Sequence, residues 1–276
     1  MPEYHKIQTM FKRNMEAPGR PLIEGHWTLG EFEYLALNRW QLTEKVAGQN
    51  IRLEWDGRIS FFGKTDKALI PAPLYARLMD RFYPQIVTFE RRFPTGATLY
   101  FEGYGPGIEN GGKYRSDQDI VLLDVKVGEW WLRRSSLEDV ANRFSLPIVP
   151  IIHTGNDTLL DAIELVKNGF QSRWGAFEAE GLVAKPMMEL RTRGGDRIIT
   201  KIKAQDFRIG VPIIRRDALE MSRKTLEDAE MERSALFRVK SEFQYSAASC
   251  LIPGGKARHK CGDSFICSLC ASGFGN

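Results

Sequence analysis

The chain has 276 residues, of which 43% are hydrophobic and 27% charged, with a formal net charge of +4. These values are ordinary for a soluble globular protein, and the mild positive charge permits a nucleic-acid partner without requiring one. No apolar run is long enough to span a bilayer and the first residues hold no apolar signal core, so we expect no membrane partner and a cytoplasmic location.

The first half of the chain predicts an irregular lead-in followed by a β-hairpin. Residues 1–26 are basic and contain prolines, which favours irregular structure, and Thr28 could cap a short helix within residues 27–40. Residues 51–55 alternate between apolar and polar types, Asp56-Gly57 is a two-residue hairpin signal, and residues 58–62 supply the returning strand. Lys45 therefore stands at the entrance to a hairpin, and Lys64 lies in the polar loop that follows it.

The second half predicts further strands that alternate with helices. Helices are expected at residues 74–79, 137–144 and 157–168, and strands at 97–101, 119–127 and 197–203, with a further short strand flanked by Glu180 and Lys185. The nearly continuous apolar run at 119–127 is typical of a strand at the centre of a sheet. The period of two places Lys201 and Lys203 on one face of the last strand.

Several charged residues lie in or beside these apolar runs: Lys45, Glu102, Glu180, Lys185, Lys201 and Lys203. Each taken alone is explained as an exposed charge or, for the alternating lysines, as protection of a sheet edge. Charges inside apolar runs are nevertheless costly unless they meet a partner or a ligand. Their recurrence along the chain predicts one binding pocket for a polyanion.

Taken in order, these stretches resemble a known set of motifs. EKVAGQN, GKTD, FEGYGPG, DIVLLDV, EGLVAKP and KIK are similar to the nucleotidyltransferase motifs of covalent ligases and capping enzymes. They are most similar to those of ATP-dependent RNA ligases of the phage double-strand-sealing type, over roughly residues 27–207. If the protein is phage-encoded, its expected location is the host cytoplasm.

The resemblance implies an α+β fold, with a nucleotidyltransferase domain (ATP-grasp-like ligase) of antiparallel sheets flanked by helices and a small C-terminal helical extension. The expected segments are a lead-in at 1–26, an adenylyltransferase domain at 27–210, a helical extension at 211–248 and a cysteine-containing tail at 249–276.

The resemblance also implies roles for individual residues. Lys45 would attack the α-phosphorus of ATP to give a lysyl-AMP intermediate, while Lys201 and Lys203 would act as catalytic cations on the phosphates. Glu180 would bind Mg²⁺ or Mn²⁺. The implied nucleotide contacts are Glu44, Val46, Asn50, Lys64, Glu102, Ile120, Val183 and Lys185.

Three of these contacts have particular expected functions, and one position departs from the family pattern. Glu102 would hold the ribose hydroxyls, Val183 would line the adenine pocket, and Ile120 stands where relatives stack an aromatic ring on the base. Ala47 replaces a residue that is polar in many relatives. This change removes a polar contact beside Lys45 and leaves the nucleophile intact.

The implied activity is ATP-dependent joining of RNA 3'-hydroxyl and 5'-phosphate ends in RNA repair, with a nicked duplex as the expected partner. Two alternatives within the superfamily are a DNA ligase and a GTP-using capping guanylyltransferase. An alternative of another class is a non-catalytic nucleic-acid-binding protein whose lysines contact only backbone phosphates. The oligomeric state is left open.

The tail offers a separate hypothesis of a zinc site. All four cysteines of the chain lie after residue 249, which argues against a disulfide framework in the main domain. His259, Cys261, Cys267 and Cys270 supply four donors, including a C-x-x-C pair, that could bind Zn²⁺ tetrahedrally. The alternative is a disordered tail with reduced thiols, and we assign no catalytic role to it.

Overall fold

The computed structural model describes residues 3–208 and Met231. The tail at 249–276, with its candidate zinc ligands, and all of the predicted helical extension except Met231 lie outside the described residues. The chain divides into two compact units, Met1–Arg223 and Lys224–Asn276, and the description below concerns the first. Among the described residues, none of the helices has the length and apolarity that crossing a membrane requires.

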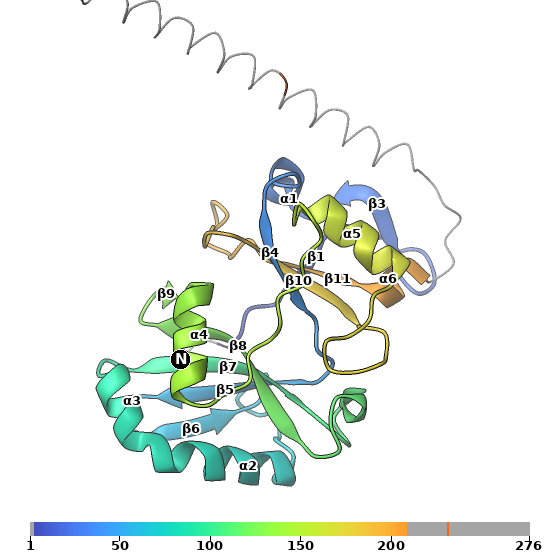
Figure 1. Cartoon of the computed structure of the whole chain (residues 1–276). Helices are drawn as coiled ribbons and strands as arrows, with labels where there is room; N and C mark the ends of the chain where they lie inside the picture. Colours follow the sequence, from blue (N-terminus) through green and yellow to red (C-terminus); the bar gives the residue numbers. More distant parts are fainter. Residues whose placement is uncertain (1–2, 209–230, 232–276) are drawn as a thin grey trace, which may run out of the picture. The chain divides into compact units, whose positions relative to one another are not determined.

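A five-stranded antiparallel sheet in the order β6-β5-β7-β8-β9 forms one half of this unit (Figure 1). The strands are β5 (Gln49–Trp55), β6 (Ile59–Phe62), β7 (Ala97–Tyr104), β8 (Asp119–Val127) and β9 (Trp130–Trp131). The hairpin predicted around Asp56-Gly57 is confirmed, with Gly57 at φ +98°. As its apolar sequence predicts, β8 is not an edge strand: it pairs with β7 on one side and with β9 on the other, and β7 is the middle strand of the five.

Helices cover one face of this sheet and enclose the main apolar core. They are α2 (Ala72–Phe82), α3 (Ile86–Arg92) and α4 (Arg134–Arg143), with the short 3₁₀ turn η1 (Tyr83–Gln85) between α2 and α3; a second 3₁₀ turn, η2 (Gly111–Lys113), lies in the loop between β7 and β8. Phe82, Phe89 and Phe144 pack there against alternate strand residues such as Leu53 and Phe101. The opposite face of the sheet carries polar side chains such as Glu102 and Asp124 beside a smaller apolar cluster that includes Val121 and Tyr104.

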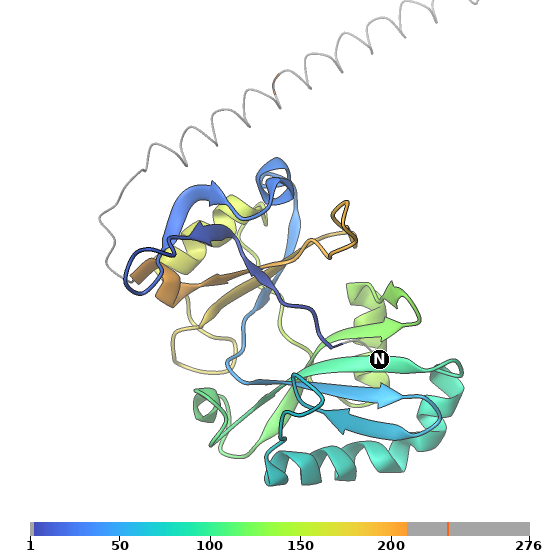
Figure 2. The ribbon, with the colours of Figure 1, turned by 180° about the vertical axis from the view of Figure 1, so that it is seen from behind.

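A second sheet has the order β1-β11-β10-β4 and is antiparallel except for the parallel pair β1–β11. Its strands are β1 (Gln8–Thr9), β4 (Trp40–Glu44), β10 (Gly181–Pro186) and β11 (Thr200–Lys203). Helix α5 (Leu159–Asn168) packs on one face, where Leu182, Ala184 and Ile202 are buried. Helix α6 (Ala204–Arg208) follows β11, and Figure 2 shows this half from behind. The predicted α+β fold with antiparallel sheets is confirmed.

The prediction of an irregular lead-in at residues 1–26 is wrong. Besides β1, the lead-in forms β2 (Phe11–Arg13) and most of β3 (Leu22–Trp27), which pair with each other before α1 (Gly30–Tyr34). These strands form because Phe11 and Trp27 are buried against each other, with ring centroids 4.9 Å apart. The N-cap of α1 is Leu29 rather than the predicted Thr28.

Candidate active site

Lys45 lies immediately after β4, in the connection that joins the two sheets. Its Nζ is 3.0 Å from Oε2 of Glu180, and Nζ of Lys203 is 2.9 Å from Oε1 of the same carboxylate. The three side chains are 19%, 18% and 22% exposed, respectively. The structure therefore brings together the predicted nucleophile at the end of β4, the predicted metal ligand just before β10 and one predicted catalytic cation in β11.

Two more predicted residues share the electrostatic environment of this group. Burial lowers the pKa of Lys201, and Lys203 and Lys45 lower it further. Burial raises the pKa of Glu102 to about 8, against the opposing effect of Lys45. We call Lys45, Glu102, Glu180, Lys201 and Lys203 the Lys45 cluster. The pKa of Glu180 shifts in the opposite direction to that of Glu102: burial would raise it, but Lys45 and Lys203 outweigh this effect and lower it.

Glycines allow the backbone to approach closely on both sides of the cluster. A Cβ added to Gly48 would lie 2.2 Å from the carbonyl oxygen of Gly103 and 3.0 Å from Cγ of Glu102. Gly181 has φ +149°, and a Cβ there would lie 2.0 Å from the carbonyl oxygen of Ile202. Only glycine fits at either position. The motif glycines thus fix the chain directions that bring Lys45, Glu102 and Glu180 together.

A tyrosine that the sequence analysis missed holds the turn after Lys45. The backbone N–H of Ala47 donates to the hydroxyl oxygen of Tyr114 at 3.1 Å. Tyr114 is buried in an aromatic group with Tyr104, Trp174 and Phe177. Burial raises the pKa of Tyr114 to about 12, so its hydroxyl stays protonated at neutral pH. Position 47 therefore receives a polar contact through its backbone although its side chain is apolar.

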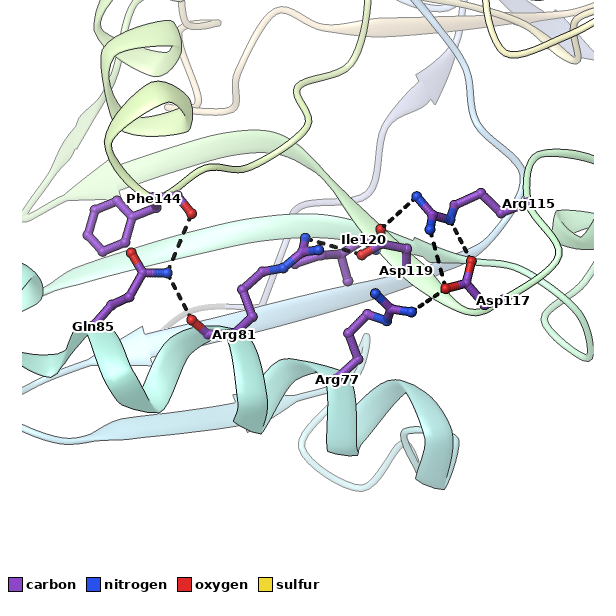
Figure 3. Close-up of polar contacts among 8 residues, drawn as sticks. All are labelled: Arg77, Arg81, Gln85, Arg115, Asp117, Asp119, Ile120 and Phe144. Atoms are coloured by element: carbon purple, nitrogen blue, oxygen red, sulfur yellow. Dashed lines mark hydrogen bonds and ion pairs between the residues drawn. The ribbon is translucent and has the colours of Figure 1, made fainter.

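Ion pairs anchor the loop that carries Tyr114 to helix α2 (Figure 3). The buried carboxylate of Asp119 lies 3.1 Å from Arg81 of α2 and 3.3 Å from Arg115. Asp117 pairs with Arg115 at 2.6 Å and also with Arg77 of α2. Asp117 and Asp119, which follow Tyr114 by three and five residues, thus hold the C-terminal end of the loop to α2.

The side chain of Glu44 does not serve the predicted nucleotide contact. Its buried carboxylate accepts hydrogen bonds from the Ser172 hydroxyl at 2.6 Å and the Arg173 backbone N–H at 2.8 Å. It therefore anchors the loop after α5. A cavity of about 600 Å³ beside this loop is lined by none of the predicted site residues; its lining is Ile152, His153, Leu165 and residues 170–175. Val46 is buried against Tyr104 and Tyr114.

The predicted base contact at Ile120 is wrong, because its side chain points to the helix-covered core. Ile120 is fully buried there with Leu122, whereas Val121 packs with Val46, Tyr104 and Tyr114 on the other face. Strand β8 is buried on both faces, so its apolar sequence does not reveal which residues face the site.

The remaining predicted contacts lie around the cluster. Asn50 is the β5 partner of Glu102, and its Nδ2 donates to the Phe101 carbonyl oxygen at 3.4 Å. Val183 is half-buried and pairs with Lys201 across β10 and β11, which places both on the same face. Lys64 is exposed in the turn after β6. Asn50 and Val183 are thus strand neighbours of members of the Lys45 cluster.

Lys185 belongs to a different group of charges than predicted. Its Nζ is 2.6 Å from Oδ2 of Asp124 in β8, the oxygen that also accepts hydrogen bonds from Arg197 at 3.0 Å and from the Tyr4 hydroxyl at 2.7 Å. Burial lowers the pKa of Lys185, with Asp124 opposing the shift. Lys185 thus joins the two sheets. The sequence alone did not point to Asp124, Arg197 or Tyr4 as members of this group, although Asp124 lies within the DIVLLDV motif.

The Lys45 cluster fits a divalent cation that is bound largely by a nucleotide's phosphates. Among the described residues, no group of three or more His, Cys, Asp or Glu side chains could hold a metal by itself. Mg²⁺ commonly takes one or two protein carboxylates and completes its shell with phosphate and water. Glu180, an ionised carboxylate among lysines, meets this requirement as the single protein ligand.

Comparisons with known proteins bear on the fold. No protein-family model and no curated protein matches the sequence. Structures of an RNA ligase from Naegleria gruberi do match. An apo mutant matches with a TM-score of 0.52 and 15% identity, and the match covers 75% of this chain and 58% of the ligase chain. For a mutant with ATP and Mn, the TM-score is 0.52 and the identity 16%, with 75% of this chain and 61% of the ligase chain covered. For the ligase with PPi, the TM-score is 0.51 and the identity 18%, with 74% of this chain and 62% of the ligase chain covered.

The chain thus spans about three fifths of the ligase chains that it matches. At this level of identity the likeness establishes the fold alone: the chain shares the fold of these RNA ligases over the matched part.

Proposed function

We propose that the protein is an ATP-dependent RNA ligase that joins 3'-hydroxyl and 5'-phosphate ends through a lysyl-AMP intermediate. The observation that carries the proposal is the Lys45 cluster, in which residues that are far apart in the sequence lie together: Lys45 after β4, Glu102 of β7, Glu180 before β10, and Lys201 and Lys203 of β11. The fold shared with ligases whose structures contain ATP or AMP supports it.

In the first step, Nζ of Lys45 loses a proton to solvent and attacks the α-phosphorus of ATP. A P–N bond forms as the bond from that phosphorus to the bridging β-phosphate oxygen breaks, releasing pyrophosphate, and a second proton leaves the nitrogen to give the neutral phosphoramidate. Lys201 and Lys203 neutralise the charge that develops on the phosphate oxygens. A divalent cation, when bound at Glu180 and the phosphates, would supply further charge stabilisation. Glu102, whose raised pKa keeps it largely protonated at neutral pH, can donate a hydrogen bond to a ribose oxygen.

Two further transfers complete the proposed reaction. The 5'-phosphate of one RNA end attacks the lysyl-AMP phosphorus, which frees Lys45 and gives an adenylylated end. The 3'-hydroxyl of the other end then attacks that 5'-phosphate, forming the phosphodiester and releasing AMP. The lysines are positioned to stabilise charge on the phosphates in all three transfers.

Mass spectrometry after incubation with ATP and Mg²⁺ tests the first step. We expect one added AMP on the native protein and none on Lys45→Ala, because no other nucleophile occupies that position. Lys12→Ala changes an exposed lysine and serves as the matched control, which should be labelled like the native protein. Native protein without an adduct, but with salt-sensitive RNA binding, would support the non-catalytic alternative instead.

Two comparisons separate the related enzymes. An adduct with GTP but not with ATP would indicate a capping-type guanylyltransferase. Joining assays on RNA, DNA and hybrid nicks distinguish an RNA ligase from a DNA ligase, and we expect efficient joining only when the ends are RNA.

A further inference from the structure

A buried arginine lies on the face of the five-stranded sheet that the helices do not cover. Ile51 and Leu53 of β5 pack into the helix-covered core, so the alternation of the strand directs Asn50 and Arg52 to the other face. Arg52 is only 1% exposed. Asn50 pairs across the strands with Glu102, a member of the proposed catalytic site. Arg52 therefore lies on the same face as that site, two residues further along β5.

The partners of the Arg52 guanidinium come from the sheet surface and from one exposed loop. Nε lies 2.8 Å from Oε1 of Glu54, and the ring centroid of Phe62 lies 4.7 Å from the guanidinium carbon. Nη2 pairs with the carboxylate of Asp66. Nη1 is buried and makes no hydrogen bond among the described residues. A buried N–H without an acceptor is costly, so this guanidinium is suited to a further ligand that brings oxygen acceptors.

Asp66 is the partner that a ligand can replace. Its side chain is 70% exposed, and residues 64–67 are all exposed. The loop is fixed after this point, where Nε2 of Gln49 donates to the carbonyl oxygen of Leu69 at 2.7 Å. An exposed carboxylate is hydrated with or without its partner, so leaving Arg52 costs it little. The buried guanidinium, in contrast, needs an anion in that position.

The other charges of the loop favour an anionic ligand. Lys64 and Lys67 flank Asp66, and neither has a carboxylate partner in the part of the chain that the structure describes. Once Asp66 is displaced, these two lysines and Arg52 face an incoming anion with only Glu54 opposing them. Phosphate suits this arrangement, because the guanidinium fork donates two parallel hydrogen bonds to phosphate oxygens and lysines add point charges.

The position of Arg52 indicates which phosphate it binds. The proposed reaction already assigns Lys201 and Lys203 of the other sheet to the phosphates at the reacting end. Arg52 follows Asn50, the strand partner of Glu102, by two residues, which is roughly 7 Å along β5. A phosphate at Arg52 therefore lies beside the reacting end rather than at it, as a neighbouring backbone phosphate of the RNA does.

We propose that Arg52 binds a backbone phosphate of the RNA next to the end being joined, and that Asp66 competes with this phosphate for the guanidinium. RNA displaces Asp66, and the loop then offers Lys64 and Lys67 to the same strand. This inference rests on the proposed function and extends it, since it adds a phosphate site outside the Lys45 cluster and a carboxylate of the chain that opposes RNA binding.

The central test is Asp66→Asn, which removes the competing charge and leaves Arg52 in place. We expect nicked RNA duplex to bind about three- to five-fold more tightly, as measured by fluorescence anisotropy. Asp56→Asn is the matched control, because it makes the same change of charge at a 56% exposed side chain in the turn between β5 and β6. The control reports the effect of net charge alone. Binding by Asp66→Asn that is no tighter than binding by Asp56→Asn overturns the inference.

Arg52→Lys tests the guanidinium itself, since it keeps the charge and loses the fork. We expect RNA to bind about ten-fold less tightly, and the addition of Asp66→Asn to this variant to give no gain. Urea unfolding shows whether the variant is folded. An arginine that only stabilises the sheet would lower the free energy of unfolding, while the gain from Asp66→Asn would persist in the double variant and contradict the proposal.

Two modified substrates identify the strand. Each nicked duplex carries one uncharged methylphosphonate linkage next to the nick, either on the strand with the 5'-phosphate or on the strand with the 3'-hydroxyl. The linkage at the true position should weaken binding by the native protein and leave binding by Arg52→Lys nearly unchanged. If neither linkage shows this difference, Arg52 contacts neither phosphate and the inference is wrong.

Lysine adenylylation by ATP, measured on the native protein in parallel, separates the two proposals. Its absence contradicts the proposed function, whereas the binding measurements still report on Arg52 and Asp66. Adenylylation together with equal RNA affinities of Asp66→Asn and Asp56→Asn contradicts the phosphate site alone.

Discussion

At the scale of single residues, Glu102 makes the clearest prediction. Its pKa is raised from 4.5 to about 8, so between these values the folded protein binds a proton that the unfolded chain does not. The free energy of unfolding must then fall as pH rises, by about 1 kcal/mol per pH unit between roughly pH 6.5 and 8. We expect urea unfolding of Glu102→Gln to show a flatter pH dependence than that of the native protein over this range.

The lower limit of that range is set by His5. Burial lowers its pKa to about 4, so from pH 4 to 6.5 the unfolded chain binds more protons at this position and stability rises with pH. Above pH 6.5 the effect of Glu102 on the free energy of unfolding can therefore be measured without a contribution from His5. If the free energy of unfolding changed with pH in the same way for Glu102→Gln and the native protein above pH 6.5, the Glu102 carboxylate would be ionised in the folded state and the prediction would be wrong.

The residues of the site differ in how far the sequence can predict them. Lys45, Glu180 and Lys203 could be named in advance because their motifs contain glycines with specific backbone requirements. Ile120 was assigned to the wrong face, because a strand buried on both sides has no polar alternation to read. Tyr114 lies in an irregular loop, where no periodicity connects it to Ala47 across 67 positions.

At the scale of elements, the loop from β7 to β8 positions the turn after Lys45. Tyr114→Phe removes only the hydroxyl that accepts the Ala47 N–H, and leaves a buried amide unsatisfied at a cost of ~1–3 kcal/mol. We expect single-turnover adenylylation to slow about ten-fold, with a smaller change in the ATP concentration that gives half the maximal rate, because the turn is less well fixed while the nucleotide contacts remain.

Tyr75→Phe is the control, since Tyr75 is 43% exposed on α2, distant in sequence from this turn. Equal adenylylation rates for Tyr114→Phe and the native protein would mean that the hydrogen bond has no role in positioning Lys45. Loss of ATP affinity without a change in maximal rate would place Tyr114 in nucleotide binding instead.

Elements with local signals were predicted, and those that depend on distant partners were not. The hairpin of β5 and β6 carries its own turn in Asp56-Gly57, and the helices carry apolar periodicity. Strand β1 has two residues and forms only because Gln8 and Thr9 pair with Thr200 and Lys201 at the other end of the domain. A segment this short contains no pattern from which such a partner could be read.

At the scale of the whole described unit, Asp124 links the two sheets and the N-terminal segment. Its Oδ2 accepts from Tyr4, Lys185 and Arg197, which come from the lead-in, from β10 and from the loop before β11. Burial alone would raise the pKa of Asp124, but Lys185 and Arg197 lower it to about 2. The carboxylate therefore contributes stability above its unfolded pKa of 3.8, and this contribution is lost as pH falls toward 2.

Asp124→Asn leaves the buried Lys185 without its counter-charge and Arg197 with Glu189 alone, so we expect the free energy of unfolding at pH 7 to fall by ~3–5 kcal/mol. Tyr4→Phe removes one donor of three and should cost only ~0.5–1.5 kcal/mol. Denaturant unfolding measures both, and the part of the native protein's acid sensitivity between pH 4 and 2 that Asp124 causes should be absent from Asp124→Asn. A similar small loss in both variants would mean that the sheets are held together by apolar packing, and that Lys185 is free to serve the nucleotide after all.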